Sequence, residues 1–297
     1  MTASDDLAGL YAAPFRISWP EDQTAPFVFA SPHSGRVYPP EFAAQSPLGA
    51  LSLRRSEDAF VDGLFSTAVG FGAPLIVARF PRAYCDANRS PAELDSAMFE
   101  GRLAGAIDTT SPRVNAGLGV IPRIVRDGAE IYRAKLAPRE AEERLAKLHR
   151  PYHAALARLI EMTVARHGAA VLIDCHSMPS AAVVPDVVLG DRYGMSASPA
   201  LVRHAQRVFE SLGFSVARNA PYAGGYTTHV HGRPARGVHA LQIEINRSLY
   251  LDEERIEPGP RYESLRARLD EAIRALVDVN PAILRGGGAR EVPLAAE

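Results

Sequence analysis

Short apolar runs and helical apolar patterns alternate along the chain. The runs predict strands at 26–30, 74–78, 169–174 and 238–245. Apolar residues at helical spacing predict helices at about 56–69, 138–167, 198–212 and 261–277. Strands that alternate with helices indicate a mixed, largely parallel sheet covered by helices on both faces. We therefore expect an α/β fold with three layers, α/β/α.

Two of the predicted helices carry signals at their ends. Ser56 can cap a helix, and Glu57 and Asp58 suit the positive end of a helix dipole. The long helix contains Pro151, which is expected to kink it, and Gly168 is expected to end it.

Residues 81–125 form a long segment that is rich in Pro, Gly, Arg and Asn and shows little periodicity. So long an irregular segment in a compact domain is usually functional. Guanidinium groups bind carboxylates bidentately, so Asn88 and Arg89 in this segment suit a substrate that bears carboxylates. The ordinary alternative is a set of surface arginines paired with the 34 acidic residues. The arginines in and beside the segment are Arg79, Arg82, Arg89, Arg113, Arg123 and Arg126.

Composition and charge exclude several classes of protein. The 297 residues are 47% hydrophobic and 23% charged, as in an ordinary globular protein. The formal net charge of -1 argues against a general nucleic-acid binder, which needs a basic surplus. No apolar stretch approaches the roughly 18 residues that cross a bilayer, and no signal peptide is expected.

The chain is expected to be one cytoplasmic domain. Cys85 and Cys175 are too few for a disulfide framework and lack the spacing of a cysteine zinc site, so a reducing cytoplasm is the simplest location. A single catalytic domain is expected over 1–297, with an N-terminal extension at 1–25 and a tail at 286–297.

His33 and His176 each come directly after a predicted strand. Ligand sites in α/β sheets gather outside the carboxyl ends of the strands, where two imidazoles can bind a metal. Each histidine alone is more simply explained as a capping or hydrogen-bonding residue. Together with Glu57 or Asp58, they indicate a catalytic zinc site with two histidines, one carboxylate and an open position for water. The two acids can equally be ordinary residues of a helix start.

Glu244 lies in a predicted strand where polar and apolar residues alternate, so Gln242, Glu244 and Asn246 share one face. A half-solvated sheet face explains this pattern as well. A strand inside a large α/β sheet is usually covered on both sides, however, and a covered carboxylate needs a partner or a role. The general base of a metal-dependent hydrolase is such a role.

Three other groups of residues suggest different chemistry. His149 and His153 lie four apart on a helix, but a proline lies between them and no glutamate follows the first. His229 and His231 fit a His-x-His site of a barrel, against which the predicted helices argue. Cys175 suggests a nucleophile, but the histidine next to it on a strand points to the opposite face. A buried structural thiol is the simpler interpretation.

Five short blocks resemble, in the same order, the signature blocks of the N-formylglutamate amidohydrolase family. They are Ser31-Pro32-His33-Ser34-Gly35, Asp86-Ala87-Asn88-Arg89, Asp174-Cys175-His176-Ser177, Gly224-Gly225-Tyr226 and Gln242-Ile243-Glu244. The resemblance extends over about 27–255. The family is distantly similar to zinc carboxypeptidases, aspartoacylase and succinylglutamate desuccinylase, which implies a zinc-carboxypeptidase-like fold.

The resemblance also implies roles for individual residues. One zinc per chain would be held by His33, His176 and Asp58, because the spacing to the following Val-Asp pair favours Asp58 over the alternative, Glu57. Glu244 would be the base that activates water. The α-carboxylate of the substrate would be held by Asn88 and Arg89.

The expected activity is hydrolysis of an N-acylated acidic amino acid, such as N-formyl-L-glutamate, with a role in histidine degradation. Arg123 is expected to help stabilise the oxyanion, and Arg82, Tyr226 and His229 to contact the substrate. The alternatives are action on other N-acyl amino acids or small peptides, and a binding protein that has lost catalysis. The expected partner is a small-molecule substrate, with no nucleic acid, no membrane and no signal for an oligomeric state.

The chain departs from the family pattern after the Gly-Gly block. Many members carry an arginine and a Tyr-Gly pair there, whereas this chain has Thr228-His229-Val230-His231-Gly232. We expect this segment to line the pocket for the acyl group or side chain, so the departure bears on the choice of substrate and not on the metal.

Overall fold

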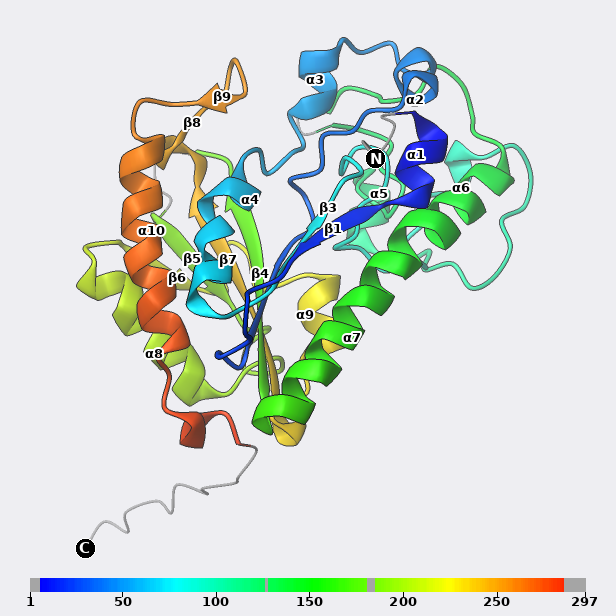
Figure 1. Ribbon diagram of the computed structural model, residues 1–297. Helices are drawn as coiled ribbons and strands as arrows, with labels where there is room; N and C mark the ends of the chain where they lie inside the picture. The colour runs from blue at the N-terminus through cyan, green and yellow to red at the C-terminus, as the bar shows by residue number, and fades with distance from the viewer. Residues whose placement is uncertain (1–5, 126–127, 181–184, 286–297) are drawn as a thin grey trace, which may run out of the picture.

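A seven-stranded sheet lies between two layers of helices (Figure 1). The computed structural model describes residues 6–125, 128–180 and 185–285. The tail predicted at 286–297 and the side chain of Arg126 therefore lie outside the described residues.

The sheet has the strand order β1-β3-β2-β4-β7-β5-β6. Strand β1 is antiparallel to β3 and β5 is antiparallel to β7, whereas the other neighbours are parallel. The prediction of an α/β fold with a mixed, largely parallel sheet is therefore confirmed. The strands are β1 Phe15–Ser18, β2 Phe27–Ser31, β3 Leu75–Ala78, β4 Ala170–Met178, β5 Val187–Gly190, β6 Val216–Arg218 and β7 Val238–Asn246, with a separate ribbon of β8 Leu251–Asp252 and β9 Glu257–Pro258.

The helices form the outer layers. One face is covered by α4 Val61–Leu64, η1 Ser66–Phe71, α8 Pro199–Ser211 and α10 Tyr262–Val277. The other is covered by α1 Leu7–Ala12, α6 Pro138–Arg144, the π-helical segment η3 Leu145–His149, α7 Arg150–His167 and α9 Tyr226–His231. The short helices in the connections are α2 Pro40–Gln45, α3 Ala50–Arg54, η2 Ser96–Met98, α5 Pro112–Asn115, η4 Pro234–Arg236, η5 Arg247–Leu249 and η6 Pro281–Ile283. Across the described ranges, no helix is both long and apolar enough to span a bilayer.

The central strands alternate between two apolar clusters, one on each face of the sheet. Cys175 and Ile243 lie in the cluster beneath α8 and α10, whereas Leu172 and Ala240 lie in the cluster beneath α7. The thiol of Cys175 thus packs as an apolar group, as the simpler interpretation predicts. On the α7 face, polar residues replace apolar ones toward the carboxyl ends of β4 and β7.

The region after β2 differs from the predicted helix start. Residues 56–59 form a turn, Phe60 has a left-handed backbone (φ 63°), and α4 begins only at Val61. The backbone N–H of Asp58 donates to His33 O (3.0 Å), and that of Glu57 donates to Arg54 O (2.9 Å). These bonds tie the backbone of the two acids to the turn after β2 and to the end of α3, and both acids precede α4.

A π-helical segment lies just before Pro151, where a kink was expected. The N–H of Arg150 bonds to Leu145 O, five residues back. Proline has no N–H to donate and its ring crowds the carbonyl four residues earlier. A wider turn accommodates both effects without breaking the helix.

Strand β4 is longer than predicted and extends to Met178, so His176 lies within a strand and not after it. Strand β2 pairs with β3 on one side and β4 on the other, which makes its carboxyl end a point where strand order switches. The turn after β2 packs tightly on the end of β3, since a Cβ on Gly35 would lie 2.0 Å from Phe80 O.

Candidate active site

His33, Asp58 and His176 meet at the carboxyl end of the sheet. Oδ2 of Asp58 lies 3.3 Å from Nδ1 of His33 and 2.9 Å from Nδ1 of His176. One ligand atom of each residue lies within 4.8 Å of the others, and all three side chains are buried. The structure therefore brings together the three residues that the sequence suggested for a metal.

Each imidazole has a second carboxylate behind it. Nε2 of His33 lies 2.7 Å from Asp86 Oδ1, and Nε2 of His176 lies 3.0 Å from Asp174 Oδ2. The Asp86 carboxylate accepts the Nε2 proton of His33 and so leaves Nδ1 of that ring free to bind a metal. The contact between His176 and Asp174 is an ion pair, and Nε2 of His176 also lies 3.1 Å from Asn88 Nδ2. Two imidazoles and one carboxylate form a donor set that fits zinc and leaves one position for water or substrate.

The buried charges of this group depend on one another. Burial alone would raise the pKa of Asp58, but hydrogen bonds from His176 and His33 hold it well below its usual range. Burial alone would lower the pKa of His176, but the Asp174 carboxylate raises it well above its ordinary value. Asp174 is fully buried, and among the described residues neither of its oxygens has a hydrogen-bond partner, so its charge relies on the nearby imidazole.

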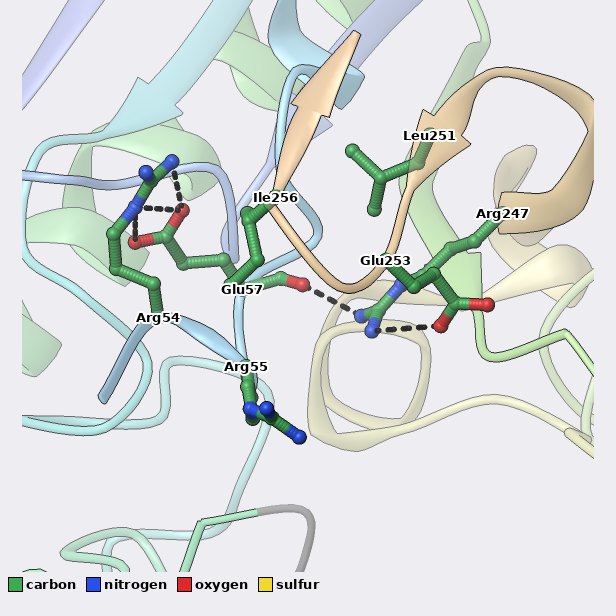
Figure 2. Close-up of a pocket in the computed structure, with 7 residues that line it drawn as sticks. All are labelled: Arg54, Arg55, Glu57, Arg247, Leu251, Glu253 and Ile256. Carbon is green, nitrogen blue, oxygen red and sulfur yellow. Dashed lines mark hydrogen bonds and ion pairs between the residues drawn. The ribbon is translucent and has the colours of Figure 1, made fainter. Parts of the chain in front are cut away.

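Glu57, the alternative metal ligand, faces away from the two histidines. Figure 2 shows its carboxylate turned toward Arg54 and its backbone carbonyl toward Arg247. The carboxylate accepts hydrogen bonds from Arg54 Nε (3.1 Å) and the hydroxyl of Tyr38 (2.7 Å). Because successive residues of this turn point in different directions, Asp58 alone of the two acids reaches the site.

Arg247, which the sequence interpretation missed, anchors the Asp58 carboxylate. Its Nη2 donates to Asp58 Oδ1 (2.9 Å) and to Glu57 O (2.6 Å), and its Nε donates to Ser177 Oγ (3.2 Å). This pairing leaves Oδ2 of Asp58 facing the histidines. Arg247 directly follows β7. Site residues of α/β sheets gather after the carboxyl ends of the strands, so this position could have indicated its role.

A cavity of about 560 Å³ opens onto the metal group. Glu244 lies in this cavity, and β7 pairs with β4 so that Glu244 is the register partner of His176. Gln242 Nε2 donates to Glu244 Oε1 (2.8 Å). Burial raises the pKa of Glu244 to about 7, although the positive charge of His176 opposes the rise. Such a carboxyl group titrates where a general base works best.

Arg82, Asn88 and Arg89 also line this cavity. Arg82 Nε donates to Asp86 Oδ2 (2.8 Å), which neutralises that carboxylate. Arg89 instead donates to two backbone carbonyls, Leu118 O (3.2 Å) and Asn88 O (3.1 Å), and lies 3.9 Å from Asp86. Burial lowers the pKa of Arg89. A nearby carboxylate therefore balances the positive charge of Arg89 less well than Asp86 balances that of Arg82.

Arg123 does not reach this cavity, contrary to the expectation that it stabilises an oxyanion. It pairs with Asp95 (3.2 Å) and Glu130 (3.3 Å) and lines a separate pocket of about 280 Å³. Asp95, from the irregular segment, and Glu130, just after it, hold its guanidinium there.

Tyr226 and His229 do not line the cavity, contrary to the expectation that they contact the substrate. The backbone of Gly225 lines the cavity, but α9 then carries the following side chains away from it. The ring of Tyr226 packs against His149 and His153 (centroids 5.5 and 5.0 Å apart), and His229 is exposed.

Further polar residues at the site escaped the sequence interpretation. Asp86 and Asp174 belong to the same short blocks as the residues that were singled out, and Asp174 shares the strand face of His176. Tyr222 lines the cavity from a segment without periodicity, so no sequence signal marked it.

Comparison with known proteins agrees with this geometry. A sequence model of the N-formylglutamate amidohydrolase family matches residues 25–251. The chain belongs to this family.

Relatives of the N-formylglutamate amidohydrolase family match most of the chain. The N-formylglutamate deformylase of Pseudomonas aeruginosa is 31% identical over 262 residues, which cover 85% of this chain and 90% of the relative. That of Pseudomonas putida is 29% identical over 242 residues, or 78% and 83%. The crystal structure of N-formylglutamate amidohydrolase from Ralstonia eutropha has a TM-score of 0.85 and 35% identity, and covers 93% of this chain and 100% of that one. The chain is therefore a hydrolase that acts on an amide bond.

Replacing Arg247 with methionine is expected to destabilise the protein strongly. The change leaves Asp58 buried with one counter-charge fewer, and breaking a buried ion pair costs about 3–5 kcal/mol. The control is Arg166→Met, which breaks an exposed pair with Asp22 and should cost at most about 1 kcal/mol. Denaturant unfolding of both variants measures the difference. Equal, small losses would show that Asp58 does not depend on Arg247.

Proposed function

We propose that the protein is a zinc-dependent deformylase that hydrolyses N-formyl-L-glutamate to formate and L-glutamate. The observation that carries the proposal is the convergence of His33, Asp58 and His176 in a cavity that also holds Glu244 and Arg89. Its relatives in two Pseudomonas species carry the name N-formylglutamate deformylase, which supports the choice of substrate.

In this proposal His33, Asp58 and His176 would hold one zinc. The carboxylates of Asp86 and Asp174 orient the two imidazoles, and the fully buried Asp174 fits a site that holds a cation. When bound, the zinc supplies Lewis acidity that polarises an amide carbonyl and makes water a better nucleophile at neutral pH.

Glu244 is the general base of the proposed reaction. It takes a proton from the attacking water as the oxygen bonds to the formyl carbon, and it passes that proton to the amide nitrogen as the C–N bond breaks. A carboxyl group whose pKa is near 7 exchanges protons readily in both directions at neutral pH. The hydrogen bond from Gln242 orients the carboxylate.

Arg89 and Asn88 bind the α-carboxylate of the substrate. The hydrogen bonds described for Arg89 go to neutral carbonyl groups, so its guanidinium gains more from a carboxylate ligand than that of Arg82, which is already paired. Arg113 lines the same cavity and adds positive charge for a substrate with two carboxylates.

The departure from the family pattern at 228–232 gives little support to a different substrate. Thr228 and His231 lie on α9, and none of the residues 228–232 lines the cavity. The residues that do line it from this region are 219 and 221–225, which precede the departure.

We expect the purified protein to bind one zinc per chain and to lose activity when a chelator removes it. Added zinc should restore hydrolysis, since the three ligands are preformed by packing. Activity should be measured on a panel of N-formyl, N-acetyl and N-succinyl amino acids, with N-formyl-L-glutamate expected to give the highest kcat/KM. Activity that persists without metal would contradict zinc dependence. A higher kcat/KM with another acyl group would show that the proposed substrate is wrong.

Replacing Glu244 with glutamine is expected to lower kcat by about 10²–10⁴-fold, the usual contribution of a positioned base. Zinc content should stay at one per chain, because Glu244 is not one of the three ligands. The base must be deprotonated to act, so wild-type kcat/KM should fall as pH drops through the pKa of Glu244, and the variant should lack this decline. A variant that is less stable but fully active per folded molecule would remove Glu244 from the mechanism.

Replacing Arg89 with lysine is expected to raise KM for N-formyl-L-glutamate roughly 10- to 100-fold, since a charge-assisted hydrogen bond is worth about 1.5–3 kcal/mol. An ammonium group cannot reproduce the two-pronged contact of a guanidinium. The matched control is Arg123→Lys, in the separate pocket, which should leave KM unchanged. If the two variants behaved alike, Arg89 would have no special role in binding the carboxylate.

A further inference from the structure

Three histidines that the proposed reaction does not use gather behind the cavity. His149 ends the π-helical segment and His153 lies one turn further along α7, while His231 ends α9. Both helices cover the same face of the sheet (Figure 1). The ring of His153 stacks on His231 (centroids 5.3 Å apart, 17° between planes) and lies 4.6 Å from the ring of His149. We call these three residues the histidine clamp.

Hydrogen-bond chemistry fixes the protons of the clamp. Nε2 of His149 lies 2.9 Å from Arg89 O, and Nε2 of His153 lies 2.7 Å from Ala87 O. A carbonyl oxygen can only accept, so both Nε2 atoms donate. Nδ1 of His153 is then the acceptor for Nε2–H of His231, at 3.0 Å. Burial lowers the pKa of all three, that of His231 to about 4, so the neutral rings persist at neutral pH.

The two carbonyls that the clamp holds flank a single residue, Asn88. They belong to a turn without regular secondary structure, so its position depends on such bonds. Helical side chains four residues apart are about 6 Å apart along the axis, which lets one helix reach both sides of one residue. The π-helical turn before Pro151 sets the direction in which His149 points.

Asn88 is held from its other sides by α9 and β7. Its Oδ1 accepts from the N–H of Thr227 (2.8 Å), and its Nδ2 donates to Gln242 Oε1 (3.3 Å) and lies 3.1 Å from His176 Nε2 on β4. Gly225 packs directly against it, since a Cβ at that position would lie 2.3 Å from Asn88 Oδ1. A small shift of the turn would therefore push Asn88 against the backbone of Gly225.

We propose that His149 and His153 are positioning residues that fix Asn88 and Arg89 for the substrate carboxylate. His231 holds the ring of His153 in the donating orientation. This inference rests on the proposed function, because it assigns the clamp to the carboxylate end of the same cavity. It also accounts for a helical histidine pair that resembles a metal site in sequence but whose Nε2 atoms both face carbonyl oxygens.

The test compares two substitutions of His153. Phenylalanine keeps a ring against Tyr226 and His231 but removes the donor to Ala87 O, whereas glutamine keeps an N–H donor at similar reach. We expect His153→Phe to raise KM for N-formyl-L-glutamate about 10- to 100-fold with a smaller change in kcat, since a displacement of about 1 Å costs up to roughly 100-fold. Zinc content should be unchanged, and His153→Gln should restore KM to within about 3-fold, because a neutral N–H···O bond survives.

The matched control is His239→Phe. His239 is another buried histidine whose Nε2 donates to a carbonyl, Leu284 O (2.9 Å), and whose Nδ1 accepts from the N–H of Ser198 (3.2 Å). The His239→Phe variant should lose as much stability as His153→Phe does and keep the KM of the wild type. If His153→Phe does not fold, His149→Phe removes the other donor and takes its place.

A second measurement does not depend on activity. Hydrogen exchange at the amides of Asn88, Arg89 and Thr227 should quicken in the clamp variant and stay unchanged in the control, because only the first releases the turn. Unchanged exchange, or an unchanged KM, overturns the proposal. If the wild type failed to hydrolyse N-formyl-L-glutamate, the proposed substrate would be wrong, and exchange alone would still decide whether the clamp holds the turn.

Discussion

The carboxylate of Asp58 is the contact on which the rest of the site depends. One oxygen lies between the Nδ1 atoms of His33 and His176, and the other accepts from Arg247. Its backbone N–H also bonds to His33 O, so the turn after β2, strand β4 and the segment after β7 meet at one residue. A buried carboxylate is costly unless its charge is matched, so this junction favours a bound cation and penalises any loss of a partner.

Much of the fold and part of the site could be predicted from strand periodicity. His33, His176 and Glu244 lie at or near the carboxyl ends of β2, β4 and β7, which are adjacent and parallel. Parallel neighbours bring their carboxyl ends to the same edge, and alternation decides which residues share a face. For this reason the polar face that contains Glu244 and the opposite, apolar position of Cys175 both follow from the order of residues along their strands.

The remaining residues could not be predicted because tertiary contacts decide their direction. Glu57 and Asp58 are chemically similar neighbours, and the left-handed Phe60 with the bond to His33 O determines which of them faces the metal group. Arg89 and Arg123 come from the same irregular segment, yet the first enters the cavity while acidic residues hold the second outside it. In a segment without periodicity, a high arginine content indicates that the ligand carries negative charge. It does not indicate which arginine binds that ligand.

The hydrogen bonds also join substrate recognition to catalysis. Asn88 donates to Gln242, and Gln242 donates to Glu244, so the group proposed to bind the carboxylate and the group proposed to move the proton belong to one chain of contacts. Gln242 and Glu244 stand on the same face of β7, which fixes the spacing at the base. The other end of this chain is a turn, and a turn is less rigid than a strand. This contrast explains why histidine side chains hold the backbone on both sides of Asn88 and the N–H of Thr227 holds its amide, while Glu244 needs only its strand.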